Sequence, residues 1–200
     1  MLTAIFGESL IVKMSTCCLD ELLIRYSAPT LAGIKTGNLF AVAKRFDQKL
    51  KKSIAQFNSH ANQKNIRLIP IKCLVNRTLL YIYRPKFLEK DFKCKTCRYF
   101  LGNLGYPVEK PAACLREYIL RLSESHEFLH EIGFFLGYPA EDVVGFMKRG
   151  PKEAKYNATW LVYSDVTSAQ HTAKTYKTCS KIYHTNWQKG KSIESLTVSI

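Results

Sequence analysis

The sequence predicts an α+β protein with a small, mainly antiparallel sheet covered by several helices. Two β-branched and aromatic stretches, residues 66–72 and 78–83, predict a hairpin that turns at residues 75–77. The stretch 159–163 predicts a later strand of the same sheet. The segments around these strands carry three- and four-residue apolar spacing. Strands grouped apart from a run of helices are typical of the α+β class.

The chain of 200 residues is long enough for one ordinary core, and we expect a single domain over residues 14–200. A hydrophobic content of 46% excludes a disordered chain. Met14 stands just before the helical run 19–25 and is a natural start. Residues 1–13 are therefore expected to form a disordered extension.

The formal net charge is +14, which favours acidic partners such as small anions, acidic proteins or nucleic acid. The lysines are scattered and do not form one block, which is also typical of an ordinary solvated surface. The N-terminus lacks the basic start of a signal peptide, and no apolar run approaches a membrane span. With seven cysteines, an odd number, we expect reduced thiols and a cytoplasmic protein with no membrane contact.

The elements follow in order along the chain. Residues 27–38 contain Pro and Gly and predict a loop. A helix with apolar positions from Leu39 to Phe57 follows, capped by Thr36 or Asn38. In the hairpin, Pro70 cannot donate a ladder hydrogen bond and predicts an edge strand.

Several short helical pieces are expected between residues 88 and 149. Residues 104–109 (LGYPVE) and 136–141 (LGYPAE) are near copies, and each predicts a helix that stops at Gly and restarts at Pro. After the later strand, Asp165 or Thr167 caps a last helix. Residues 193–200 alternate weakly and predict a short strand.

His126-Glu127-Phe128-Leu129-His130 matches the zinc-protease pattern H-E-x-x-H. On a helix the two histidines would share a face, and Glu127 would activate water. Catalytic zinc needs a third protein ligand, and no spaced histidine follows. We therefore favour an exposed His126 beside a partly buried His130, and we assign no metal ligands.

Cys94 and Cys97 form a single C-x-x-C, with no second pair at zinc-ribbon spacing. A redox pair normally follows a strand, whereas this pair falls within an expected helix. Cys17 and Cys18 are adjacent, which makes a bridge between them unfavourable. Structural roles are favoured for all four thiols.

Residues 32–37 (AGIKTG) cluster Gly, Lys and Thr before the expected helix, without the spacing of a P-loop. Free amides at a helix N-terminus with Lys35 nearby favour an anion, although a well-packed capped loop explains the same residues. Residues 137–142 end one helix and start another, as in a helix-turn-helix. The second of these helices offers mostly apolar side chains where base contacts would be needed, so DNA binding is not favoured.

Two stretches together, 28–40 (APTLAGIKTGNLF) and 130–146 (HEIGFFLGYPAEDVVGF), resemble the domain-of-unknown-function family 3793 of mostly clostridial bacteria. The resemblance runs from about Met14 to the C-terminus. It implies no assigned activity and no known cofactor, and it associates the family with neighbouring flavodoxin and iron-uptake genes. Members usually carry Pro where this chain has Leu129, so H-E-x-x-H is accidental here, and Cys where it has Ser27.

We expect a protein that binds or transforms a small anionic ligand, and the sequence leaves open whether it is an enzyme. His130 and Glu131 would act as acid and base, because His titrates near neutral pH. The expected ligand-binding residues are Lys35, Thr36, Arg84, Tyr138 and Asp142. Three alternatives remain: a partner-binding module for an acidic, flavodoxin-like protein, a zinc-dependent hydrolase through H-E-x-x-H, and a nucleic-acid-binding protein.

Overall fold

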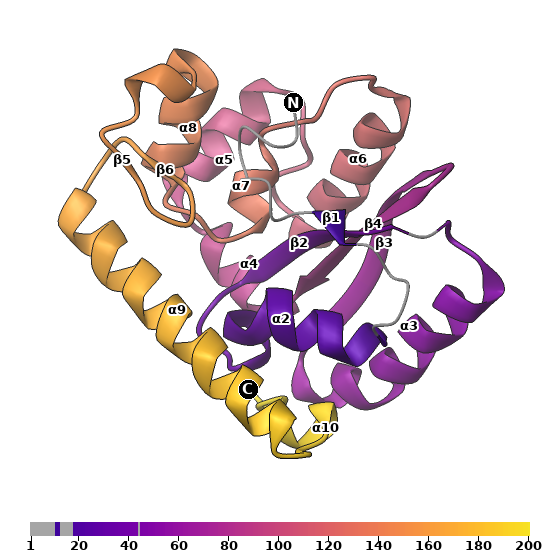
Figure 1. The fold of residues 1–200 in the computed structure, drawn as a ribbon. Helices are drawn as coiled ribbons and strands as arrows, with labels where there is room; N and C mark the ends of the chain where they lie inside the picture. The colour runs from indigo at the N-terminus through magenta and orange to yellow at the C-terminus, as the bar shows by residue number, and fades with distance from the viewer. Residues whose placement is uncertain (1–10, 13–17, 44) are drawn as a thin grey trace. The chain divides into compact units, whose positions relative to one another are not determined.

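The computed structural model describes residues 11–12, 18–43 and 45–200 (Figure 1). It confirms the α+β class, with helices and strands mixed along the chain. Contacts divide the chain into two compact units. The sheet unit comprises Ile11–Pro85 and Thr175–Ile200, and the helical unit comprises Lys86–Lys174. Compactness does not establish independent folding, so the single domain over residues 14–200 stays a prediction.

The main sheet lies in the sheet unit and has the strand order β1-β2-β4-β3. Its strands are β1 (Ile11–Val12), β2 (Gly37–Val42), β3 (Arg67–Leu74) and β4 (Arg77–Tyr83). β4 pairs antiparallel with both β2 and β3, which confirms the hairpin. Pro70 lies on the edge strand β3, as expected, beside a register shift between Pro70 and Lys72.

The third antiparallel strand is not the expected one. Residues 37–42 form β2 and not the start of a helix, because β2 lies between β1 and β4 and is buried along nearly its whole length. An apolar run without alternation is equally compatible with a helix and with a buried strand. The predicted later strand is shorter, as β6 (Leu161–Val162), and pairs with β5 (Tyr156–Asn157) in a separate sheet.

Two helices cover one face of the main sheet, α2 (Leu19–Leu31) and α3 (Gln48–Ala61) (Figure 1). α2 runs through Pro29, so the loop predicted over residues 27–38 is wrong in its first part. α3 begins late because Asp47 caps it by accepting a hydrogen bond from Leu50 N. Thr36 and Asn38 therefore cap no helix.

The sheet unit is completed by its C-terminal segment. The second half of α9 (Val166–Gln188) places Tyr183 in the core, and α10 (Ile193–Leu196) adds Ile193 and Leu196. The strand expected over residues 193–200 is wrong, since Ser192 caps a short helix there. Of the predicted extension, only Ile11–Val12 is described, as β1. The other residues of 1–13, whose disorder was expected, lie outside the described residues.

Arg84 joins the parts of the sheet unit. Its side chain is fully buried at the end of β4. Its guanidinium donates to the carbonyls of Thr30 (2.7 Å), Leu31 (2.8 Å), Lys64 (3.0 Å) and Val198 (2.8 Å). These carbonyls belong to the end of α2, the short 3₁₀ turn η2 (Asn62–Lys64) and the C-terminal segment. The negative end of the α2 dipole thus receives a positive charge.

The helical unit consists of several short helices, as expected. They are α4 (Pro85–Asp91), α5 (Lys95–Asn103), α6 (Pro111–Glu124), α7 (Ile132–Phe135), α8 (Ala140–Arg149), the 3₁₀ turn η3 (Pro151–Glu153) and the first half of α9, which Asp165 caps through Ser168 N. Phe135 is fully buried, and its ring centroid lies 5.3 Å from that of Phe92 and 5.2 Å from that of Tyr118. No helix in the described part of the chain is long and apolar enough to cross a bilayer.

The two LGYP copies stop helices as predicted but restart them differently. Gly105 (φ 78°) follows α5, and Gly137 (φ 73°) follows α7, each in the left-handed conformation that glycine adopts without strain. Pro139 directly precedes α8. In the first copy, α6 begins only at Pro111, so Pro107 does not open a helix.

Replacing Arg84 by Met should lower the free energy of unfolding by about 3 kcal/mol or more, because four carbonyls, two of them in fully buried hydrogen bonds, lose their donor. Arg84→Lys should recover little, since one ammonium cannot reach four separated acceptors. Denaturant unfolding followed by circular dichroism measures both. Arg67→Met on the exposed side of β3 is the matched control, and equal effects of the two Met variants would contradict the assignment.

Candidate ligand cavity around His130

The seven residues predicted to form the site fall into both units. Lys35, Thr36 and Arg84 belong to the sheet unit, whereas His130, Glu131, Tyr138 and Asp142 belong to the helical unit. The structure brings His130, Tyr138 and Asp142 to one cavity within the helical unit. The convergence of Lys35 with His130 stays a prediction.

This cavity, the His130 cavity, lies among α7, α8 and the segment of β6. It has a volume of about 40 Å³ and is lined by His130, Ile132, Gly133, Tyr138, Asp142, Val143, Phe146, Trp160 and Leu161. The space holds a few water molecules or the edge of a small ring. Its wall is mainly apolar and aromatic, with few polar groups, as is usual for sites that bind small organic ligands.

Local sequence explains why these residues meet. The turn at Gly137 and Pro139 folds α8 back beside α7. Gly133 permits their close approach, because a Cβ at this position would lie 2.7 Å from Val143 Cγ2. Tyr138, in the turn itself, stacks on Trp160 with ring centroids 5.2 Å apart. The two rings form one continuous aromatic wall.

Asp142 anchors this wall. Its buried carboxylate accepts four hydrogen bonds, from Trp160 Nε1 (2.7 Å), Tyr163 N (2.8 Å), Ser164 N (2.8 Å) and Ser164 Oγ (2.7 Å). Three of these bonds end on Oδ1, and the bond from Trp160 ends on Oδ2. Asp142 was predicted as a ligand-binding residue, and in this geometry it orients the indole of Trp160 at the cavity.

His130 lines the cavity and has a ring nitrogen without a hydrogen-bond partner among the described residues. Its Nδ1 is buried and has no hydrogen bond among the described residues. The ring edge meets Phe146, with centroids 4.9 Å apart. Burial lowers the pKa of His130 against the raising effect of Glu131 and Glu127. The imidazole is therefore neutral at neutral pH, and one of its nitrogens is a hydrogen-bond acceptor.

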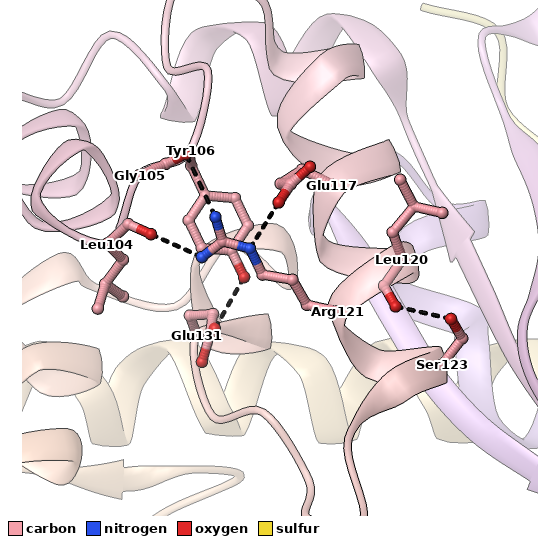
Figure 2. Close-up of polar contacts among 8 residues, drawn as sticks. All are labelled: Leu104, Gly105, Tyr106, Glu117, Leu120, Arg121, Ser123 and Glu131. Carbon is pink, nitrogen blue, oxygen red and sulfur yellow. Dashed lines mark hydrogen bonds and ion pairs between the residues drawn. The ribbon is translucent and has the colours of Figure 1, made fainter.

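Glu131 faces a different partner. Its carboxylate accepts a hydrogen bond of 2.8 Å from the hydroxyl of Tyr106. Figure 2 shows this contact beside the side chain of Arg121. The Arg121 guanidinium lies 4.1 Å from the centre of the Tyr106 ring and donates to Glu117 (2.7 Å) and to the carbonyl of Leu104 (2.6 Å). Burial and the hydrogen bond to Glu131 raise the pKa of Tyr106, which stays protonated. Glu131 thus holds the first LGYP turn.

The H-E-x-x-H segment is not helical. It lies between the end of α6 at Glu124 and the start of α7 at Ile132, so His126 and His130 do not share a helix face. Across residues 11–12, 18–43 and 45–200, no group of three or more His, Cys, Asp or Glu side chains is arranged to hold a metal ion. The zinc-hydrolase alternative loses the helix on which it depended.

The loop at Lys35 and Thr36 leads into a strand, so the helix N-terminus expected to bind an anion there does not exist. Lys35 is 5% exposed and donates to the carbonyl of Gly37. Burial lowers the pKa of Lys35 to about 7. Thr36 is also buried, and its carbonyl accepts from the backbone N–H of Arg84 (2.8 Å). These residues have structural contacts within the sheet unit.

Sequence reasoning missed a second cavity, of about 180 Å³, in the sheet unit. It is lined by Cys18, Leu19, Asp20, Ser53, Gln56, Phe57, His60, Ala61, Lys64, Ile193, Glu194 and Thr197. Burial and the nearby Glu194 raise the pKa of Asp20. The ammonium of Lys64 donates to the carbonyls of Glu194 and Thr197 (2.9 Å for the latter). None of the lining polar atoms is buried without a partner, so the His130 cavity is the stronger candidate.

Comparison with known proteins gives one family. The sequence profile of the family described as "Protein of unknown function (DUF3793)" matches residues 23–197. No curated protein and no solved structure gave a significant match. The match includes all residues that line the His130 cavity and all that line the second cavity except Cys18, Leu19 and Asp20. It also includes every residue predicted to form the site.

The buried amine of Lys35 should make stability depend on pH. The pKa of Lys35 is about 7 in the folded state, against the ordinary value of 10.5 in the unfolded chain. Between these two pH values the unfolded chain therefore binds more protons than the folded state. The free energy of unfolding should therefore rise from pH 7 towards 10.5, with a contribution of up to about 1.4 kcal/mol per pH unit. Lys35→Met should remove this slope in denaturant unfolding, and Lys49→Met, exposed on α3, should keep it.

Proposed function

The chain belongs to the DUF3793 family, and because that description assigns no activity, we propose a function from the geometry: the protein binds a small planar molecule in the His130 cavity. The observation that carries this proposal is the buried, unpartnered Nδ1 of His130 at an aromatic wall. A buried polar atom without a partner costs about 1–3 kcal/mol. A bound molecule that donates a hydrogen bond would remove this cost.

The lining residues support a particular class of ligand. Tyr138, Trp160 and Phe146 favour a ring that stacks or meets their edges. The neutral His130 favours an N–H or O–H donor on that ring. The charge of +14 favours a ligand whose additional anionic substituent stays in solvent. The expected small anionic ligand thus becomes a ring with a donor group and an outer acidic group.

The geometry favours binding over catalysis. Glu131 bonds to Tyr106, so the acid–base pair expected from His130 and Glu131 has no supporting contact in the described part of the chain. A general base is usually oriented by a hydrogen bond to its second nitrogen, and among the described residues Nδ1 of His130 accepts or donates none. We place the protein in the cytoplasm, where thiols such as its six described free cysteines stay reduced.

Matched ring probes test the site. Indole carries an N–H donor, and benzofuran has the same shape without it. The indole N–H resonance of Trp160, assigned by comparison with Trp187→Phe, reports binding because Trp160 lines the cavity. Indole should bind about fivefold more tightly than benzofuran, and His130→Leu should remove this difference, since a hydrogen bond contributes about 1 kcal/mol.

Cavity filling supplies the control. Leu161→Phe narrows the cavity and should abolish binding of both probes, whereas Leu74→Phe, the same change at an exposed position of β3, should not. Equal binding of indole by wild type and Leu161→Phe would overturn the proposal. Melting temperatures of each variant separate lost binding from lost folding.

A second candidate function rests on α9. This helix of 23 residues contains no Asp or Glu, and its lysines at 177 and 181 are exposed beside Ile182, which is 54% exposed. Positive charge around an exposed apolar side chain suits an acidic protein partner. Such a partner is the alternative that the sequence already suggested.

Charge reversal tests this candidate with a purified flavodoxin as a defined acidic protein. Lys177→Glu with Lys181→Glu should weaken binding about tenfold or more at low salt, because opposite charges steer and hold the complex. Lys49→Glu with Lys52→Glu, equally exposed on α3, is the matched control. Tighter binding to a DNA duplex than to the flavodoxin would favour the nucleic-acid alternative instead.

A further inference from the structure

The C-x-x-C pair occupies a different place from the one expected. Cys94 is not inside a helix but immediately before α5, with an extended backbone (φ −62°, ψ 122°). Its carbonyl accepts from Arg98 N (3.0 Å), which makes it the N-cap of a nine-residue helix. Cys97 is then the third residue of the first turn. In other proteins, thiols of Cys-X-X-Cys motifs and at helix N-termini are among those that take part in thiol–disulfide exchange.

The two thiols differ in exposure. Cys94 is partly exposed, whereas Cys97 is buried at 3% exposure. Helical rise and radius separate Cα atoms three residues apart by about 5 Å, within the range that a disulfide spans. A partly exposed thiol therefore lies three residues before a buried one, at a backbone spacing that a disulfide can span.

A third thiol lies near the pair. Burial raises the pKa of Cys97 to about 12, and Cys94, Cys114 and Asp91 add to this effect through their proximity. Cys114 is fully buried on α6. Among the described residues, these side chains belong to no group of three or more that could hold a metal ion.

We infer that Cys94 and Cys97 form a reversible dithiol–disulfide site that exchanges with low-molecular-mass anionic disulfides. The exposed lysines at 93 and 95, on either side of Cys94, supply the preference for an anionic reagent. This site is independent of the ligand proposed for the His130 cavity.

The exchange balances in two steps. The Cys94 thiolate attacks one sulfur of the disulfide R–S–S–R, forms a mixed disulfide and releases R–S⁻, which takes up a proton. Cys97 then loses its proton and attacks the Cys94 sulfur, which forms the Cys94–Cys97 disulfide and releases a second R–SH. Two protein thiols are oxidised and one disulfide is reduced to two thiols. The buried Cys97 makes the second step the slower one.

Oxidised glutathione, an anionic disulfide, is the probe. The reduced full-length chain is treated with it, quenched by alkylation and mapped by peptide mass spectrometry. We expect glutathione on Cys94 first and a Cys94–Cys97 disulfide later. Cys97→Ser should stop at the mixed disulfide, Cys94→Ser should prevent the disulfide, and Cys114→Ser should still form it. A Cys97–Cys114 product, or slower modification of Cys94 than of the exposed Cys73, would overturn the inference.

Reagent charge tests the substrate class on the same protein. Oxidised glutathione should modify Cys94 about tenfold faster than the cationic disulfide cystamine, with neutral bis(2-hydroxyethyl) disulfide between them. High salt should reduce this difference in rate, because it screens exposed charges. The double variant Lys93→Glu with Lys95→Glu should also reduce it, because it reverses the two charges beside Cys94. Circular dichroism of each variant verifies its folding. Equal rates for all three disulfides would contradict the anionic preference.

Discussion

The buried guanidinium of Arg84 is the interaction on which the sheet unit depends. A charge at this depth requires acceptors for its donors, and here backbone carbonyls supply them, with no carboxylate among them. Burial lowers the pKa of Arg84 only to about 10, so the group stays charged at neutral pH. Because the acceptors come from α2, η2 and the C-terminal segment, one side chain fixes three chain segments against the end of β4.

Polar side chains have a comparable role in the helical unit. Arg121, Tyr106 and Glu131 together stabilise the first LGYP turn. Asp142, just after the second LGYP turn, binds the backbone of Tyr163, which follows β6. Short helices bury little apolar surface each, so charge-assisted hydrogen bonds stabilise the turns between them. The same contacts occupy Glu131 and Asp142 and leave His130 as the group of this motif that faces a cavity without a partner.

The two proposed sites use opposite properties of the helical unit. The His130 cavity is aromatic and suits recognition of a ring, since few of its groups change charge near neutral pH. The Cys94–Cys97 site lies at a helix start, flanked by lysines, and suits chemistry on sulfur. Neither depends on the arrangement of the two units, because each is built from residues of Lys86–Lys174.

The sequence by itself determined the α+β class, the hairpin, the edge position of Pro70 and the helix stops at Gly105 and Gly137. These features depend on local rules: alternation, the missing N–H of proline and the left-handed conformation of glycine. Family membership was likewise readable from two motifs. Three of the residues that the sequence suggested for a site, His130, Tyr138 and Asp142, line one cavity because a single turn brings them together, and their role in binding stays a prediction.

Only the tertiary structure decided the remaining points. Residues 37–42 became a strand because β1 and β4 lie on both sides of it, and residues 193–196 became a helix beside the α2 core. The roles of Arg84 and Glu131 also depended on distant partners, Val198 and Tyr106, which no local spacing reveals. Sequence patterns identify which side chains can bind or react, but long-range packing decides which of them already have a partner.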